Sequence, residues 1–380
     1  MSLQNAGFRP RSAAVALLAL GSILAAALVL PGGQVTRHSS PSGALADRMA
    51  WAAGEAAKGG TGKGFWIGYG IRRLMGEHSN FCMNMDWGSK GASTLDELIY
   101  GHRSLVEKRA SNAVPPSGAG AGPERKVVKE VAVLLRYDSP AARKPRAIAA
   151  GNLEFSPSLD GLPLFWLGPA SDEESVRLLQ GFYAAGDPEE LRSNVIHAVG
   201  LHRKPDLVVP FLERVIDGRE VEHIRADAAA FLGEQPDPRA LEILKRTVAT
   251  DASAEVRENA VDGLIEIELP AAADVLIDLA RRAKDEEIRN EAIHGLAEKA
   301  TKATIAVLEQ LAYGDKDTEI RKEAVQALAD LPEKGGLLYV IKAAKTHPDK
   351  EARIAAIEAL GEFHDPAAKQ ALLEIIKRRL

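Results

Sequence analysis

The chain has 380 residues, with 53 acidic and 48 basic side chains and a formal charge of −5. This length predicts two domains and a targeting segment. The mixed charge, which shows no basic stripe, argues against a nucleic-acid-binding protein. Its single cysteine, Cys82, excludes a disulfide within the chain and a thiolate metal cluster.

The first 46 residues have the pattern of a signal peptide or a membrane anchor. Arg9 and Arg11 precede an uncharged run over residues 12–30, and small residues up to positions 27 and 46 offer two cleavage sites. The run is nearly long enough to span a bilayer, so an uncleaved anchor in the inner membrane stays open as an alternative. Both interpretations predict a periplasmic or secreted protein, because the arginines stay on the cytoplasmic side.

Residues 47–168 are predicted to form a small domain that is α+β or mostly β. Apolar residues alternate with a period of two over residues 65–71 and again over 131–137, which indicates two strands. Between these strands, residues 112–123 (NAVPPSGAGAGP) are predicted to be a flexible insert. Weaker strand patterns follow at residues 146–150 and 162–167.

Residues 169–186 are predicted to link this domain to the rest of the chain through one helix. Ser171 and Glu174 have the spacing of a capping box at its start, and Ala185-Gly186 ends it. We expect this helix to dock the strand domain onto the first repeat of the following region. It would cover an apolar end that otherwise faces water.

Residues 187–380 are organised by an arginine that recurs every 32 or 33 residues. Small or apolar residues follow these repeat arginines at offsets of three, four and seven, which form one face of an α-helix. A second apolar helix follows in each unit, so the unit is a helical hairpin that buries its apolar face by stacking on its neighbours. The repeat arginines are Arg192, Arg225, Arg257, Arg289, Arg321 and Arg353.

The Val/Ile-Arg-x-x-Ala-Val/Ile pattern of these units resembles HEAT repeats, in particular the short type found in bilin-lyase-like proteins. The resemblance covers six units over residues 187–380. It implies a mainly α fold in which a right-handed α-solenoid follows the small strand domain. It also implies that the repeat arginines are structural and form a ladder with aspartates between stacked units, for which Asp285, Asp317 and Asp349 stand four residues before an arginine.

The resemblance further implies that the first helix of each unit lies on the outer, convex face and that the second helix lines the concave face. We therefore predict a partner-binding surface on the second helices, with acids in the early units and lysines in the late ones. Such a graded charge could orient a bound protein or peptide. The predicted residues are Glu213, Glu242, Arg246, Asp274, Asp278, Gln310, Tyr313, Lys342, Lys345 and Glu374.

The sequence offers little catalytic chemistry, and we predict no catalytic residue, cofactor or metal site. The iron-binding His-Glu dipeptides of deoxyhypusine hydroxylase, an enzyme branch of the HEAT family, are missing, and so is the HExxH zinc motif. The remaining candidate is Cys82, with His78 and Asp86 four residues away on either side. A Cys–His pair can make a nucleophile, but this spacing in a loop does not establish one.

The favoured hypothesis is an exported scaffold that binds a protein or peptide on the concave face of its solenoid. The alternative is an enzyme whose site lies in residues 64–168, near Cys82 and either His78 or His102, with the solenoid as a docking arm. A third hypothesis is a structural role in which the final helix, residues 367–380, recruits another chain, because no polar cap follows it.

Overall fold

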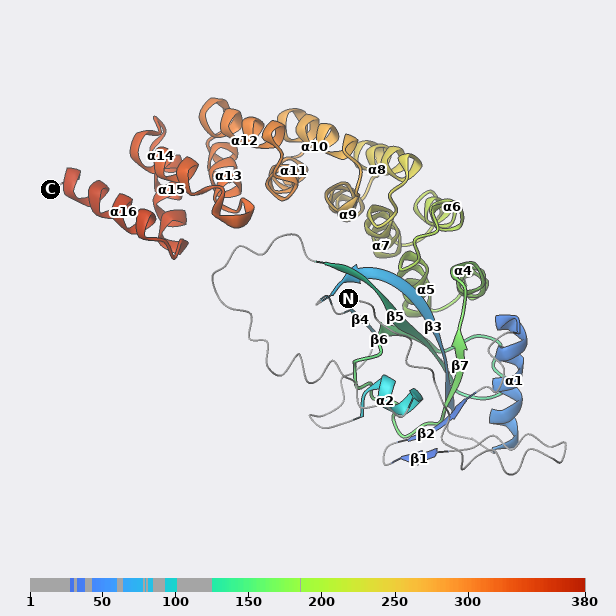
Figure 1. Cartoon of the computed structure of the whole chain (residues 1–380). Coiled ribbons are helices and arrows are strands. Elements are labelled where there is room, and N and C mark those ends of the chain that lie inside the picture. Colours follow the sequence, from blue (N-terminus) through green and yellow to red (C-terminus); the bar gives the residue numbers. More distant parts are fainter. Residues whose placement is uncertain are drawn as a thin grey trace, which may run out of the picture.

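The computed structural model describes residues 28–30, 33–37, 43–59, 64–77, 79, 81–84, 93–100, 125–184 and 186–379. These residues form a small domain built on one sheet and a long arc of paired helices that leads away from it (Figure 1). The expected fold class, a mainly α solenoid of helical hairpins preceded by a strand-containing domain, is confirmed.

The sheet has seven strands in the described residues, in the order β1-β2-β7-β3-β5-β6-β4. Its centre is a long antiparallel ribbon of β3 (Phe65–Gly76) and β5 (Lys126–Tyr137), which pair over their whole length. Strand β7 (Leu164–Pro169) runs parallel to β3, and β6 (Ala147–Asn152) runs antiparallel to β5. The short strands are β1 (Leu28–Leu30), β2 (Gly33–Arg37) and β4 (Cys82–Met83).

Each of the four strand patterns read from the sequence corresponds to one of these central strands. Alternate residues of β3 face two different layers: Ile67 and Tyr69 lie in the core shared with the repeats, whereas Trp66 packs against α2 (Leu95–Tyr100) on the other face. The predicted flexible insert at residues 112–123 lies outside the described residues.

Strand β2 falls inside the segment that was predicted to be a signal peptide or anchor. It pairs in parallel with β7, so residues 33–37 are part of the sheet. Residues 1–27, which hold most of the apolar run, lie outside the described residues. Within the described part of the chain, none of the helices has both the length and the apolar character needed to cross a membrane.

Helices α1 (Leu45–Lys58) and α4 (Asp172–Gly181) cover one face of the sheet and are hydrogen-bonded to each other. The capping box at Ser171 and Glu174 is present, and the Glu174 carboxylate also accepts the first backbone N–H of α1 at 2.9 Å. Arg48 of α1 is buried and donates to two carbonyl oxygens at the end of β7, at 2.7 and 2.8 Å. These bonds fix both helices against the sheet.

A buried chain of hydrogen bonds joins the sheet to the first repeat through α4. The His202 Nδ1–H donates to the Ala198 carbonyl at 2.9 Å, which leaves Nε2 to accept from the Ser175 hydroxyl at 2.9 Å. Ser175 in turn accepts from the Tyr69 hydroxyl of β3 at 2.9 Å. Burial lowers the pKa of His202, in keeping with its neutral form. The linking helix α4 therefore connects the sheet to the first repeat.

Six helical hairpins follow in residues 189–379, and the first helix of each carries the repeat arginine. A short 3-10 turn, η1 (Pro332–Lys334), precedes α14. The hairpins are α5 (Glu189–Gly200) with α6 (Pro205–Ile216), α7 (Glu222–Gly233) with α8 (Pro238–Thr250), α9 (Ala254–Glu266) with α10 (Ala271–Arg282), α11 (Glu286–Lys299) with α12 (Lys302–Gly314), α13 (Thr318–Ala329) with α14 (Leu337–Thr346), and α15 (Lys350–Glu362) with α16 (Pro366–Arg379).

The repeat arginines bind acids that lie between successive first helices. Arg257 pairs with Asp285 at 2.8 Å and Arg321 with Asp349 at 2.5 Å, and both aspartates also cap the following helix. Arg289 pairs with Asp315, which lies two residues before Asp317, the N-cap of α13. The earlier repeats use the pairs Arg192–Glu220 and Arg225–Asp251, and Arg353 donates to the His347 carbonyl.

Figure 1 shows that the first helices, α5 to α15, form the side of the arc that faces the sheet; we call them the inner row. The second helices from α6 to α14 lie on the opposite side and form the outer row. The expectation that the first helices are convex and the second helices concave therefore has to be corrected. A two-helix repeat can be divided at either helix, so the sequence period alone does not say which helix corresponds to the concave helix of the family.

The arc curves toward the inner row because its helices pack closely through small residues. A Cβ atom on Gly233 of α7 would lie 2.7 Å from the backbone of Gly263 in α9, so the two backbones are in direct contact. Successive first helices contact one another more extensively than successive second helices do. A row with closer neighbours is shorter, and the array bends toward it.

Candidate partner-binding surface

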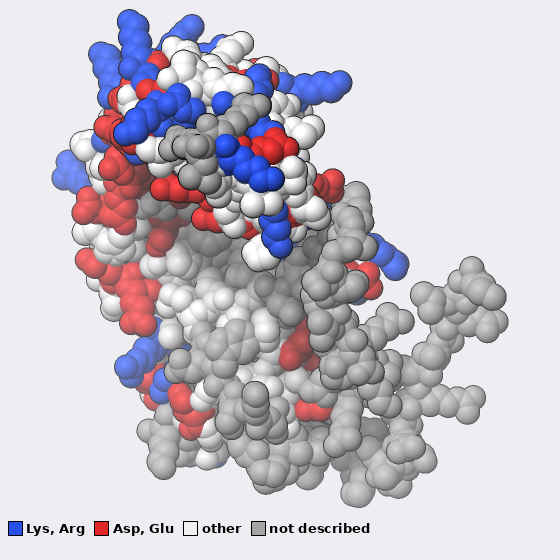
Figure 2. All heavy atoms as spheres, turned by 90° about the vertical axis from the view of Figure 1, so that its left-hand side faces the viewer, with Lys and Arg blue, Asp and Glu red and all other residues white. Residues whose placement is uncertain are grey.

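The two rows of repeat helices carry opposite charge. The six inner-row helices hold 17 acidic and 9 basic side chains, whereas the five outer-row helices hold 6 acidic and 9 basic ones. Figure 2 shows part of this distribution: Lys and Arg gather toward the top of the view, and Asp and Glu lie below them and down one side. The inner side of the arc is therefore electronegative, although the whole chain has a formal charge of only −5.

The inner row ends in a line of acids, which we call the acidic strip. One acid stands nine residues after the repeat arginine in each of five successive repeats, at or next to the C-terminal end of the first helix. Sequence reasoning missed this feature, although it has the same 32-residue period as the arginines. The acidic strip consists of Glu234, Glu266, Glu298, Asp330 and Glu362.

The acidic strip is unfavourable for the helices that carry it. A helix C-terminus has a partial negative charge, so an acid there destabilises the helix, whereas an acid at the N-terminus stabilises it. Neighbouring members of the strip also repel each other. The pKa of Glu266 is raised, first by burial and then by the carboxylates of Glu234 and Glu298. Helix stability therefore does not account for the strip.

A second contact between like charges lies beside the strip. Asp262 of α9 shares a hydrogen bond with Glu291 of α11, and partial burial together with that neighbouring carboxylate raises the pKa of Asp262 to about 6. Two carboxyl groups this close are held most easily when one keeps its proton. The inner row thus stores electrostatic repulsion that positive charge would relieve.

The sheet domain supplies such positive charge at the N-terminal end of the strip. Arg73 of β3 binds Glu234 at 2.7 Å and also donates to the Leu201 carbonyl at 2.9 Å. Nearby, Glu268 binds Lys126 of β5 at 3.1 Å and Arg203 at 3.5 Å. The first acid of the strip is therefore already occupied by a guanidinium from an extended strand.

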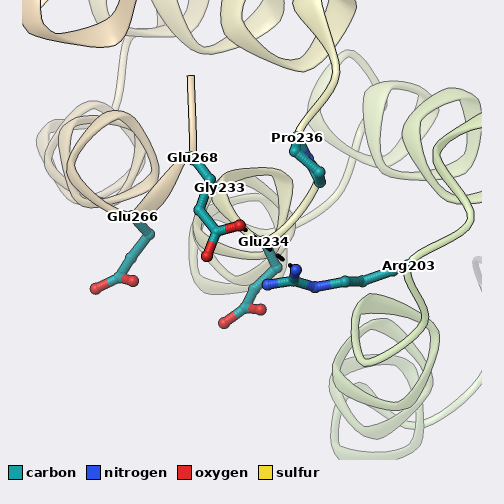
Figure 3. A pocket seen from close by; sticks show the side chains of 6 residues that line it. All are labelled: Arg203, Gly233, Glu234, Pro236, Glu266 and Glu268. Carbon is teal, nitrogen blue, oxygen red and sulfur yellow. Dashed lines mark hydrogen bonds and ion pairs between the residues drawn. The ribbon is translucent and has the colours of Figure 1, made fainter. Parts of the chain in front are cut away.

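A small cavity of about 100 Å³ lies at this end of the strip. In Figure 3, Arg203 reaches toward Glu268 and Glu234, and the Glu266 side chain points away from Arg203. The walls of the cavity therefore combine one guanidinium with three carboxylates. The lining residues are Arg203, Gly233, Glu234, Pro236, Glu266 and Glu268.

The residues predicted to bind a partner lie on the second helices, so those from α6 to α14 belong to the outer row and Glu374 lies on α16. Those on α6 to α14 therefore do not line the concave side as expected. Most of them contact one another or a near neighbour, while Asp274 is exposed. The contacts are Glu213 with Arg246 at 3.4 Å, Glu242 with Lys245 at 2.8 Å, Asp278 with Arg282 at 2.7 Å, Gln310 with Arg281 at 2.7 Å, Lys345 with Glu374 at 2.8 Å, and Lys342 over the Tyr313 ring at 5.3 Å.

The candidate thiol of the alternative hypothesis, Cys82, lies in β4 and is partly exposed. Burial raises its pKa, which lowers the thiolate fraction and hence the nucleophilicity at neutral pH. His78, Asp86 and His102 lie outside the described residues, so the enzyme hypothesis stays a prediction. Within the described ranges, no group of three or more His, Cys, Asp or Glu side chains is placed to hold a metal ion.

The final helix, which the third hypothesis invokes, exposes two large apolar side chains. Leu373 is 52% exposed and Ile376 is 56% exposed on α16. Self-association through this helix stays a prediction.

Taken together, the stacked hairpins, the recurring arginines and the curved inner row define an α-solenoid. The sequence profile of HEAT repeats matches three overlapping stretches, residues 175–265, 246–329 and 305–379, which together span more than half of the chain. The chain belongs to the HEAT-repeat family.

Among solved structures, the complex of CpcE and CpcF of phycocyanin lyase from Nostoc contains a chain 23% identical to this one, over 40% of this chain and 97% of that chain, with a TM-score of 0.32. Human deoxyhypusine hydroxylase is 19% identical over 52% of this chain and 81% of its own, with a TM-score of 0.23. YibA of Escherichia coli is 20% identical over 54% and 82%, with a TM-score of 0.34. No curated protein sequence matches the chain.

Proposed function

We propose that this protein is a scaffold that binds a protein or peptide partner along the inner row of its HEAT solenoid, from α9 to α15. The observation that carries the proposal is the acidic strip, whose acids destabilise the helices that bear them. Residues that lower stability without serving the fold are most easily explained by a function. This surface replaces the one predicted on the second helices.

The sheet domain supports this position for the partner. It packs on α5 and binds the end of α7 through Arg73 and Glu234, so it closes the N-terminal end of the inner row. The sheet reaches the end of α9, where Lys126 binds Glu268, and from α11 onward the inner row extends beyond the sheet (Figure 1). A partner would then contact several helices in succession, each contributing a few side chains, and no bond would be made or broken.

Export of the protein is part of the proposal and rests on Arg9, Arg11 and the apolar run over residues 12–30. Cleavage after residue 46 would remove β2 from the sheet and separate the first two residues of α1 from the rest of that helix. We therefore expect any cleavage to occur before β2. N-terminal sequencing of the mature protein tests this, and a first residue at position 47 would contradict it.

The partner's position is tested by amide hydrogen exchange on the protein with a partner captured from its native compartment. We expect slower exchange in α9, α11, α13 and α15, because a bound partner shields these helices from solvent. Slower exchange confined to the outer row would overturn the proposal.

A further inference from the structure

We infer that the partner presents an extended, lysine- or arginine-bearing segment to the acidic strip, with one cation for each repeat. The inference rests on the proposed function and names the chemistry of the partner. Three observations support the inference: the negative charge of the strip, the ion pair that its first member, Glu234, already makes with Arg73, and the spacing between its acids.

The negative charge of the acidic strip favours a cationic ligand. Among the described residues, no ion pair forms at Glu266, Glu298, Asp330 or Glu362, whereas Glu234 binds Arg73. Lys299 interacts electrostatically with Glu266 and Glu298, and its Nζ donates to the Ile267 carbonyl at 3.1 Å. A single lysine among these carboxylates leaves the strip negative.

The protein itself contains an example of the proposed contact. Arg73 and Lys126 lie on two paired extended strands, and they bind the first acid of the strip and the adjacent Glu268. A partner that continues past the sheet would meet Glu266 and the later acids with side chains of the same kind. The Arg73–Glu234 pair thus shows that a basic side chain on an extended strand can bind one acid of the strip.

The spacing sets the form of the segment. Packed helices lie about 8–10 Å apart, so successive acids of the strip are separated by about that distance. A polyproline-type segment rises about 3.1 Å per residue with three residues per turn, which places every third side chain on one face at intervals of about 9 Å. The partner segment is therefore one with a Lys or Arg at every third position.

Other classes of ligand fit less well. A single metal ion needs several carboxylates around one point, and no group of that kind occurs among the described residues. Nucleic acid would be repelled by the inner row. The outer row carries its charges largely in local pairs, so it offers no comparable line of uncompensated charge.

The test uses the full mature protein and a fluorescent peptide of about 15 residues in which Lys-Ala-Pro is repeated, so that each third residue is a lysine. Fluorescence anisotropy should show binding that weakens as salt rises from about 50 to about 300 mM, because exposed charges are screened. A peptide with Glu in place of every Lys should not bind. A peptide of equal composition with its lysines contiguous should bind less tightly.

The decisive comparison is between two variants with the same change in charge. The inner-row variant combines Glu266→Gln, Glu298→Gln and Asp330→Asn. Its affinity for the Lys-Ala-Pro peptide should fall roughly tenfold, since each exposed ion pair contributes only a small factor to binding. In the outer row, Glu242→Gln, Asp274→Asn and Asp278→Asn together should leave binding unchanged. Equal weakening by both variants would show a general charge effect and overturn the inference, as would absence of binding.

The two proposals can fail separately. If the lysine peptide does not bind but a captured native partner still slows exchange in α9 to α15, the basic segment is wrong and the scaffold proposal stands. If the native partner slows exchange only in the outer row, the proposed function itself is wrong. Equally tight binding of the contiguous-lysine peptide would overturn the every-third-residue spacing.

Discussion

The inner row of six helices and the outer row of five come from the same array of hairpins, yet they differ in packing and in charge. The inner helices touch through glycine and alanine and end in acids that no ion pair compensates from α9 onward in the described residues. The outer helices pair most of their charges with a near neighbour. The comparison teaches that the inner row combines the tightest packing with the least favourable electrostatics, which is the combination expected of a rigid surface that binds a charged partner.

The largest expected effect comes from breaking the close packing of the inner row. In Gly263→Val, the new Cβ would lie 2.9 Å from the Ala229 carbonyl and 2.8 Å from Leu244. We expect the free energy of unfolding, measured by urea denaturation, to fall by about 3 kcal/mol. Gly314→Val in the outer row is the matched control, because nothing lies within 4 Å of its Cβ. Equal stability of the two variants would contradict the packing account.

A repeat arginine should matter more than an outer-row arginine. Arg289→Met removes the ion pair with Asp315 and the hydrogen bond to the Ala280 carbonyl at 2.8 Å, in a site where both side chains are mostly buried. The free energy of unfolding should fall by about 2 kcal/mol. Arg246→Met, which removes two exposed pairs, should change it by no more than about 0.5 kcal/mol. The idea of a structural ladder fails if the two losses are alike.

The smallest effect is a rise in stability that depends on pH. Because the folded pKa of Asp262 is raised to about 6, its favourable contribution is present at low pH and is lost as pH rises through that value. Asp262→Asn removes this loss, so the variant should melt at a higher temperature than the wild type at neutral pH and show no such gain below the ordinary aspartate pKa of about 3.9.

The control for this effect is Asp278→Asn in the outer row, where Asp278 binds Arg282 at 2.7 Å. Its melting temperature should not rise at neutral pH, because the substitution removes an attraction. A gain of equal size in both variants would mean that net charge, and not the contact between Asp262 and Glu291, sets the effect.

The recurring arginine made the six hairpins predictable, because a period of 32 residues with helical offsets has few other physical explanations. Which helix faces inward did not follow, since the division of a two-helix repeat is arbitrary. A local signal was present: Gly263 and Gly295 stand six residues after their arginines, where alanine stands in the last two repeats. Small residues at a repeated contact indicate the side on which helices approach most closely.

For the sheet and for the acidic strip alike, local sequence patterns could be predicted, whereas contacts between distant segments could not. The long strands β3 and β5 were readable from their alternation, whereas β2 lies in a segment that resembles a targeting signal and β4 has only two residues. The acidic strip was readable as an acid nine residues after five of the six repeat arginines. Its link to Arg73 was not, because only the fold brings that residue beside Glu234.

The central claim is tested most directly by comparing amide exchange in the two helices of a single repeat, α11 and α12, with and without a captured native partner. The account predicts slower exchange in α11 on binding and unchanged exchange in α12. Slower exchange in α12 with α11 unchanged would contradict it, because the partner would then sit on the outer row.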